Sequence, residues 1–447
     1  MKAGLHTPRL HAPRLRTPLL FVGMAVLLIA VGVGQSWVVS LSILNLCLIS
    51  AIMALGLNMQ WGYAGLLNVG VMGFAALGGL AGVLISQSPV TEAWSAGGAG
   101  LGIALAVVVA AALLIVLLRR LVRRKALRTA GTAIIVVAGF FVARIFFDPA
   151  VDEIERIDSS TTGYLGGAGL PIILSWAVGG LLAAGAAWLI GKVALGLRSD
   201  YFAIATLGIA EIVITVIKNE DWLGRGVKNV TGLDRPVPYE IELQQSPWFL
   251  DLVHWLGADP ITGSSIFVKL CYAVLFVLVL IAIVWLAERA LNSPWGRMMR
   301  AIRDNEDAAA AMGKDVTRRH MQIFVLGAAV MGIAGAMLTT LDGQFTPGSY
   351  QPLRFTFLVW VMVIVGGSGN NWGAVFGGFL VWFVWVEAEP AGFWLMDAIT
   401  AGLPEDNPLR AHLLDSAAYM RLIVMGLILL VVMRFSPRGI IPERRGR

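Results

Sequence analysis

One carboxylate lies deep inside an apolar stretch, and its chemistry needs an explanation. Glu211 sits within the run YFAIATLGIAEIVITVI. An ionised side chain at the centre of a bilayer costs about 2.5–3.5 kcal/mol or more unless it is paired, protonated or wetted. Two interpretations stay open: Glu211 faces a polar path, or it forms a structural hydrogen bond to a neighbouring helix. Glu387 and Glu389 lie at a helix end, where solvation is easy, and carry less weight.

Amide side chains accompany two glycine-rich stretches. Residues 62–82 read GYAGLLNVGVMGFAALGGLAG, and residues 366–378 read GGSGNNWGAVFGG. Small residues let helices pack closely, and a broken helix can expose backbone groups to a polar path. The neighbouring amides either face such a path or tie helices together; they are Asn58, Asn68, Asn370 and Asn371. The residues that we expect along a path are Asn58, Tyr63, Asn68, Thr206, Glu211 and Asn370.

The chain lacks the motifs of an ATPase or a membrane enzyme. Gly191-Lys192 is followed by Val193, and Gly313-Lys314 by Asp315, so neither fits a phosphate-binding loop. There is no H-E-x-x-H motif, no Cys/His cluster with metal-ligand spacing and no G-x-S-x-G elbow. The two cysteines lie in apolar runs and indicate packing. We therefore expect no metal and no cofactor in this chain, and any coupling to ATP must come from another subunit.

The elements that position these residues are membrane helices. Hydrophobic residues make up 57% of the chain and charged residues 14%, and apolar runs of about 17–25 residues recur along it. This pattern predicts an all-α polytopic membrane protein. Hydropathy indicates about twelve spans. They lie near residues 19–35, 39–59, 65–86, 100–118, 129–147, 171–191, 201–218, 266–287, 320–341, 354–367, 372–388 and 418–434.

Basic residues predict the orientation. They concentrate in 1–18, 119–128, 289–319 and 434–447, and an excess of Lys and Arg marks cytoplasmic segments. The net charge of +6 therefore does not indicate nucleic-acid binding. We expect both ends in the cytoplasm. The predicted organisation is a cytoplasmic tail 1–18, a transmembrane domain 19–434 with outer loops 148–170 and 219–265, and a cytoplasmic tail 435–447.

Two spans are unusual. The segment 354–367 is short and is interrupted by Gly366, Gly367 and Gly369. The segment 201–218 begins beside Asp200, which leaves partial entry into the membrane as an alternative to a full span. If a pair of short segments is re-entrant, the count falls to about ten with the same orientation. The outer loop 219–265 contains tryptophans beside acidic residues. It forms either an amphipathic patch at the membrane interface or a docking surface for an external protein.

The loop 293–315, SPWGRMMRAIRDNEDAAAAMGKD, is too polar to cross a bilayer and is patterned as two short helices. Asn292 or Ser293 can cap the first helix, with Pro294 at its first position. Asp304 is predicted to cap the second, which should stop at Gly313. A rigid helical loop suits a partner that pushes on it. The alternative is a solvated connection between two spans.

Four stretches resemble the branched-chain amino-acid ABC transporter permeases of the LivM type, in the order of that family. They are ALGLNMQWGYAGLLNVGVMGFAALGG (54–79), LRSDYFAIATLGIAEI (197–212), SPWGRMMRAIRDNEDAAAAMGKDVTRRHMQIFVLGAAVMGIAGA (293–336) and VIVGGSGNNWGAVFGG (363–378). From the first to the last they span residues 54–378, which is most of the chain. The family is the inner-membrane component of binding-protein-dependent importers. Two regions depart from it: the insert 119–170 and the outer loop 219–265 are longer than expected.

The resemblance implies a role for loop 293–315 and a set of partners. In such importers this loop docks on an ATPase, and its residues here are Arg300, Arg303, Asp304, Glu306, Asp307, Ala308, Ala309 and Gly313. The implied partners are a homologous second permease subunit, two cytoplasmic ATPase subunits that hold ATP and Mg, and an external solute-binding protein. The implied location is the bacterial inner membrane. The implied mechanism is alternating access, with weak uncharged contacts along the path.

The solute is not fixed by the residues. Branched-chain amino acids follow from the resemblance, whereas related permeases carry urea or short amides. Two other classes remain as alternatives. An ion-coupled secondary transporter would depend strongly on Glu211, and the lack of further paired intramembrane charges argues against it. A membrane scaffold without a solute path would leave uptake unchanged when deleted.

Overall fold

The chain is a bundle of long apolar helices. The computed structural model describes residues 13–158, 162–404 and 407–443; the predictions for residues 1–12 and 444–447 lie outside the described residues. Within the described part, ten helical segments are long and apolar enough to span a membrane. They are α1 (Pro13–Gly34), α2 (Trp37–Ala64), α4 (Thr91–Leu121), α5 (Lys125–Arg156), α6 (Leu174–Ala194), α7 (Ser199–Asn219), α11 (Pro260–Asn292), α14 (Val316–Asp342), α16 (Asn371–Thr400) and 408–435. The last contains α17 (Pro408–Asp415), η3 (Ser416–Tyr419) and α18 (Met420–Phe435). The predicted all-α polytopic fold is confirmed.

Two further apolar helices are short: α3 (Val71–Ser86) and α15 (Pro352–Gly366). The brevity of segment 354–367 was expected. The predicted span 201–218 corresponds to α7, which is long and apolar enough to cross a membrane, so its length does not favour the alternative of partial entry. Asp200 lies in the first turn of α7, where the helix dipole favours a carboxylate. The chain instead breaks after α2, where Gly65 adopts a φ of +72°.

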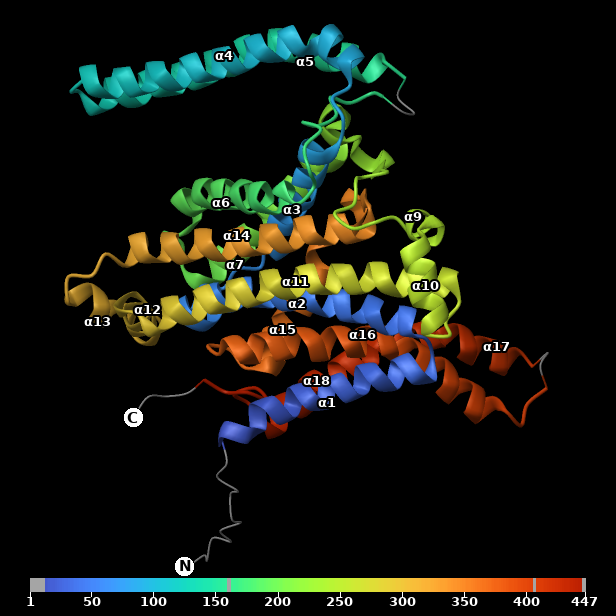
Figure 1. The fold of residues 1–447 in the computed structure, drawn as a ribbon. Coiled ribbons are helices and arrows are strands. Elements are labelled where there is room, and N and C mark those ends of the chain that lie inside the picture. Colours follow the sequence, from blue (N-terminus) through green and yellow to red (C-terminus); the bar gives the residue numbers. More distant parts are fainter. Residues whose placement is uncertain (1–12, 159–161, 405–406, 444–447) are drawn as a thin grey trace, which may run out of the picture.

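The core lies where α14 crosses α2, α3 and α6, at the centre of the bundle (Figure 1). Glycines bring these backbones together: a Cβ added to Gly78 of α3 would lie 1.9 Å from the carbonyl oxygen of Gly332 on α14. A Cβ on Gly335 would lie equally close to the carbonyl oxygen of Ala75. The small residues of the glycine-rich stretch 62–82 therefore pack helices, as one of the two interpretations required.

The connecting loops lie at the two opposite ends of the bundle. One end of the bundle carries α12 (Pro294–Asp304), α13 (Glu306–Ala311), the start of α1 and the turn between α4 and α5 (Figure 1). The opposite end carries α9 (Glu240–Gln245), α10 (Pro247–Trp255) and α17. Loops that the basic residues predict to be cytoplasmic thus share one end, and we call it the α12 end.

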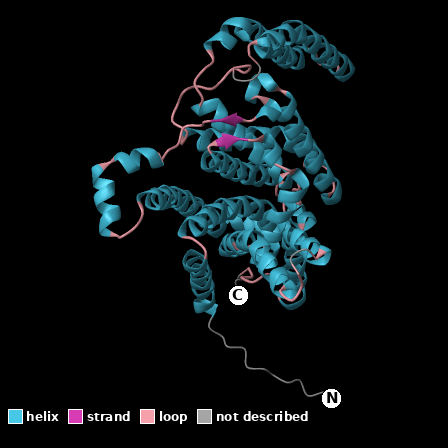
Figure 2. Ribbon diagram, turned by 90° about the vertical axis from the view of Figure 1, so that its right-hand side faces the viewer, coloured by secondary structure: helices cyan, strands magenta, loops and turns pink. Residues whose placement is uncertain are grey.

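The long loop 219–265 is folded rather than extended. It contains α8 (Asp221–Gly224), η1 (Gly226–Lys228) and β1 (Val230–Thr231), followed by α9 and α10. Strand β1 pairs antiparallel with β2 (Gln344–Phe345), with Val230 opposite Phe345. Figure 2 shows the two strands side by side over the end of the bundle. After β2 comes η2 (Pro347–Ser349). The pairing ties the loop to the end of α14, because β2 directly follows that helix. Val230 and Phe345 are both buried.

The insert 119–170 contributes to a helical hairpin that stands apart from the bundle. Helices α4 and α5 pack mainly against each other (Figure 1). Only 6% of the most apolar stretch of each helix is buried. Helix α5 continues to Arg156, so the predicted outer loop 148–170 begins later than expected. The side chain of Trp94 donates to the carbonyl oxygen of Leu165 (3.0 Å), which ties the base of the hairpin to the chain that follows it.

Candidate functional site

The loop 293–315 forms two capped helices at the α12 end. The Ser293 hydroxyl accepts a hydrogen bond from the Gly296 amide and Pro294 begins α12, as the sequence predicted. The cap of α13 is Asn305, whose side chain accepts from the Ala308 amide at 2.9 Å. The prediction of Asp304 as this cap was wrong, because α12 continues through Asp304 and only Asn305 has the extended backbone of a capping residue.

The two helices differ in how they contact the bundle. Met299 and Ile302 of α12 are buried, and the Trp295 indole donates to the Gln322 side chain on α14 at 3.2 Å. In α13 only Ala309 is buried. The side chain of Met312, directly after α13, is 79% exposed. Helix α12 is therefore held by the bundle, whereas α13 presents a free surface.

Gly313 adopts a φ of +77° after α13, as expected of a residue that ends a helix. The predicted loop residues Glu306, Asp307 and Ala308 are exposed on α13. Arg300 lies half-buried on α12, beside a cavity of about 550 Å³. Acidic and amide groups, including Glu288, share this cavity. Of the charged loop residues, Glu306 and Asp307 thus lie on the exposed helix α13, whereas Arg300 lines the polar cavity beside α12.

Arg303 joins α12 to two other segments. Its guanidinium donates to the Gly62 carbonyl at the end of α2 and pairs with Glu443 at 3.0 Å and with Asp304 at 3.1 Å. Burial lowers the pKa of Arg303, but the hydrogen bonds and charges of Glu443 and Asp304 together outweigh it, so that the pKa is raised. Glu443 was not predicted as a site residue, since nothing in the basic tail distinguishes it.

A cluster of polar side chains forms hydrogen bonds at the break between α15 and α16. The Asn58 side chain accepts from the Gly369 amide at 2.8 Å and donates to the Asn371 side chain at 3.4 Å. The Tyr63 hydroxyl also donates to Asn371, and Asn371 donates to Glu288 at 3.0 Å. Sequence reasoning missed Glu288, which directly follows the predicted span 266–287.

A second cluster of polar side chains forms hydrogen bonds at the break between α2 and α3. The side-chain amide of Asn68 donates to the Gln60 side chain at 2.7 Å, and the backbone carbonyl oxygen of Asn68 accepts from the Trp360 indole at 3.0 Å. The Thr206 hydroxyl of α7 accepts from the Val69 amide at 3.0 Å. Gln60 in turn donates to the Phe324 carbonyl on α14 at 2.8 Å. Side chains thus pair backbone groups at both breaks, namely the Val69 amide, the Asn68 carbonyl and the Gly369 amide.

The six residues predicted along a path occupy different surroundings. Asn58, Tyr63, Asn68 and Thr206 are buried, with the partners described above. The side chain of Asn370 caps α16 and donates to the Pro442 carbonyl at 3.0 Å. Glu211 is exposed. A path role for these residues stays a prediction, and the structure gives the two buried clusters a second role in holding the broken helices.

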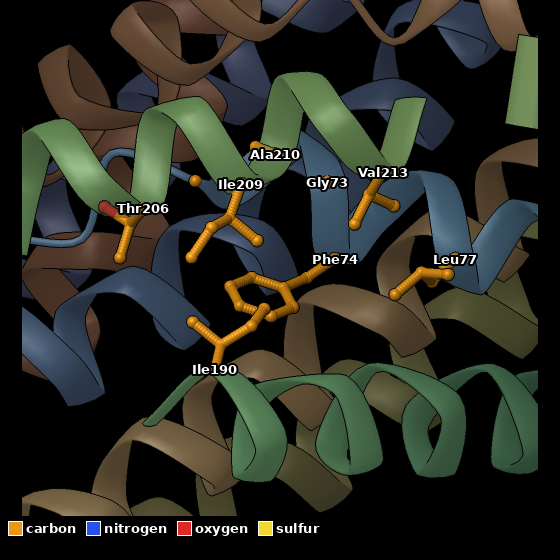
Figure 3. A pocket seen from close by; sticks show the side chains of 9 residues that line it. Gly73, Phe74, Leu77, Ile190, Thr206, Ile209, Ala210 and Val213 are labelled. Atoms are coloured by element: carbon orange, nitrogen blue, oxygen red, sulfur yellow. The ribbon is translucent and has the colours of Figure 1, made fainter. Parts of the chain in front are cut away.

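The two faces of α7 explain the exposure of Glu211. Figure 3 shows Thr206, Ile209, Ala210 and Val213 on the face toward Phe74 of α3 and Ile190 of α6. The space left there is about 10 Å³, too small for any solute larger than a water molecule. The other face of α7 carries Glu211 among further exposed residues, which include Tyr201, Ile204, Gly208, Ile212, Thr215 and Val216. We call this face the exposed stripe of α7.

A membrane helix with an exposed carboxylate, on a bundle whose centre contains two interrupted helices, is typical of a membrane transport protein. The family model described as "Branched-chain amino acid transport system / permease component" matches residues 39–166 and 157–433. The chain belongs to this family, which is a transport permease component and not a catalytic subunit. No solved structure matches the chain.

Curated relatives agree with this family. The "High-affinity branched-chain amino acid transport system permease protein LivM" of Escherichia coli is 30% identical over 209 residues, 46% of this chain and 48% of that protein. The protein of the same name from Salmonella typhimurium is 30% identical over 208 residues, 45% and 47%. "Fructose import permease protein FrcC" of Rhizobium meliloti is 25% identical over 134 residues, 29% and 36%. The chain thus spans about half the length of the two LivM proteins.

Proposed function

We propose that this chain is the membrane-spanning subunit of an ATP-driven importer and translocates branched-chain amino acids by alternating access. Its partners are a homologous second permease subunit, two cytoplasmic ATPase subunits that hold ATP and Mg, and an external binding protein that delivers the solute. Its location is the bacterial inner membrane. The family and the relatives named after branched-chain amino-acid transport support this proposal.

The observation that carries the proposal is the contrast between α12 and α13. A coupling element must present a surface to the ATPase and must also be fixed to the membrane helices. Helix α13 is exposed except for Ala309, whereas α12 buries Met299 and Ile302 and bonds to α2 through Arg303. A push on α13 is therefore passed through α12 to the helices that contain the two breaks.

The exposed stripe of α7 is the place that we propose for the solute path. Among the described residues, Glu211 has no hydrogen-bond or ion-pair partner, and a carboxylate that faces lipid is costly. A path between this face and the second permease subunit would be wetted. It would leave Glu211 hydrated without a protein partner. The buried clusters around Asn58 and Asn68 would then keep the helices beside the path in register.

Uptake assays with the purified complex in vesicles test the function. We expect ATP-dependent uptake of labelled leucine that requires the external binding protein and is lost without ATP. Fructose serves as one competing solute because a related permease is named for fructose import. Urea serves as another because it is the alternative solute that the sequence left open. Uptake that persists without any ATPase but follows an ion gradient would contradict the importer and favour a secondary transporter.

A thiol substituted for Glu211 tests the wetted path. In a Cys271→Ser background, Glu211→Cys should react with a membrane-impermeant thiol reagent at least about tenfold faster than Leu114→Cys, because only thiols in contact with water form the reactive thiolate. Leu114 is 53% exposed on the apolar hairpin α4–α5 and serves as the matched control. Equal and slow labelling at both positions would show that the Glu211 face is dry.

A further inference from the structure

The end of the chain is bound to the turn between α15 and α16. After α18, residues 436–443 return to the bundle at the α12 end, where the amide of Ile440 donates to Val365 and that of Ile441 to Gly366, both at 2.8 Å. The Asn370 side chain donates to the Pro442 carbonyl at 3.0 Å. We call residues 436–443 the tail segment. It is attached to the last turn of α15 and to the cap of α16.

Glycines make this contact possible. Gly439 adopts a φ of +81°, and a Cβ added to it would lie 2.3 Å from the Cα of Gly367. Gly367 has a φ of +123°, and its own added Cβ would lie 2.3 Å from the Ile441 carbonyl oxygen. Residues with side chains disfavour these conformations. The two backbones touch, so the tail segment and the turn can only move together.

The tail segment also reaches α12. The Glu443 carboxylate pairs with the Arg303 guanidinium at 3.0 Å, and both side chains are about four-fifths buried. A Cβ added to Gly369 would lie 3.0 Å from Glu443 and 3.1 Å from Arg303, so the pair lies directly over the turn. Three segments meet here: α12, the tail segment and the turn that breaks α15 from α16.

We propose that Glu443 is a positioning residue for coupling: through Arg303 it makes α12 and the α15–α16 turn move as one unit. This inference rests on the proposed function and deepens it. A displacement of α12 by the ATPase is delivered to the broken helix through a charge-assisted hydrogen bond and through backbone contacts of the tail segment. Without Glu443, α12 keeps its buried residues but loses its link to the tail segment.

The test uses the assembled complex in lipid nanodiscs and two measurements. The first is hydrogen exchange of the backbone amides of residues 295–311, and the second is the amount of solute transported per ATP hydrolysed. The variants are Glu443→Gln, which removes the charge, Glu443→Asp, which keeps it, and Gly439→Val, which displaces the tail segment. The matched control is Glu389→Gln, which breaks the ion pair between Glu389 of α16 and Arg421 of α18, whose side chains are also mostly buried.

We expect Glu443→Gln to raise exchange at α12 about twofold to fivefold, the range for a partly exposed ion pair, and to lower the transport ratio by a similar factor. Gly439→Val should raise exchange at least about fivefold, because a side chain at that φ is strained. Glu443→Asp should lie between Gln and the native residue. The control should change neither measurement.

The outcomes separate this inference from the importer assignment. Unchanged exchange at α12 in both Glu443→Gln and Gly439→Val would overturn the positioning role, whatever the transport data show. Raised exchange with an unchanged transport ratio would also overturn it, since the contact would then be structural only. Raised exchange in a complex whose native form shows no ATP-dependent transport would support the link between α12 and the turn and would contradict the importer.

Discussion

Replacement of α13 by a flexible segment is expected to separate this chain from its ATPase. We would replace residues 306–311 with alternating Gly and Ser, so that Asn305 and the anchored helix α12 stay intact. Binding of the ATPase should weaken about 30-fold or more, because a docking helix at the centre of an interface carries binding energy of 2 kcal/mol or more. Uptake should fall with it. Co-purification from mild detergent and vesicle uptake measure the two effects.

The control for this experiment is a replacement at the opposite end of the molecule. Helix α17 has no buried residue, so the same Gly/Ser replacement of residues 408–413 should leave the ATPase bound. Insertion and the elution profile of both variants should match those of the native chain, since α13 buries only Ala309. Normal ATPase binding and normal uptake after the α13 replacement would show that loop 293–315 is merely a connection between α11 and α14.

Gly78→Val is expected to prevent stable folding of the bundle. Valine would place its Cβ 1.9 Å from the Gly332 carbonyl oxygen and 2.6 Å from the carbonyl carbon. These are backbone atoms, which cannot rotate away as a side chain would. Overpacking in a core costs about 1–3 kcal/mol and sometimes more, and we expect the upper end, about 3 kcal/mol or more. Thermal unfolding in detergent, followed by the monodisperse fraction, measures the loss.

Gly185→Val on α6 provides the matched comparison. It changes the same residue type within a membrane helix, but nothing lies within 4 Å of an added Cβ there. We expect its stability to stay within about 0.5 kcal/mol of the native chain. If Gly78→Val were as stable as Gly185→Val, then the close approach of α3 and α14 would not be a determinant of the fold.

Local signals were sufficient for the helices themselves. Apolar length located the spans, and the Ser293 cap with Pro294 was read correctly, because a cap depends on residues within one turn. The misplaced cap at Asp304 shows the limit of the same reasoning. Two neighbouring residues, Asp304 and Asn305, both suit a cap, and the choice depended on how far α12 continued.

The sequence by itself determined an all-helical membrane protein, the positions of its spans and breaks, the exposed helix after α12, and a family resemblance that the family model confirmed. Only the tertiary structure decided which side chains meet. It buried Asn58 against Asn371, turned Glu211 outward and paired Arg303 with Glu443. The reason is physical: helices that are apolar all round carry no periodic signal of their buried face. Contacts between residues far apart in the chain depend on that face.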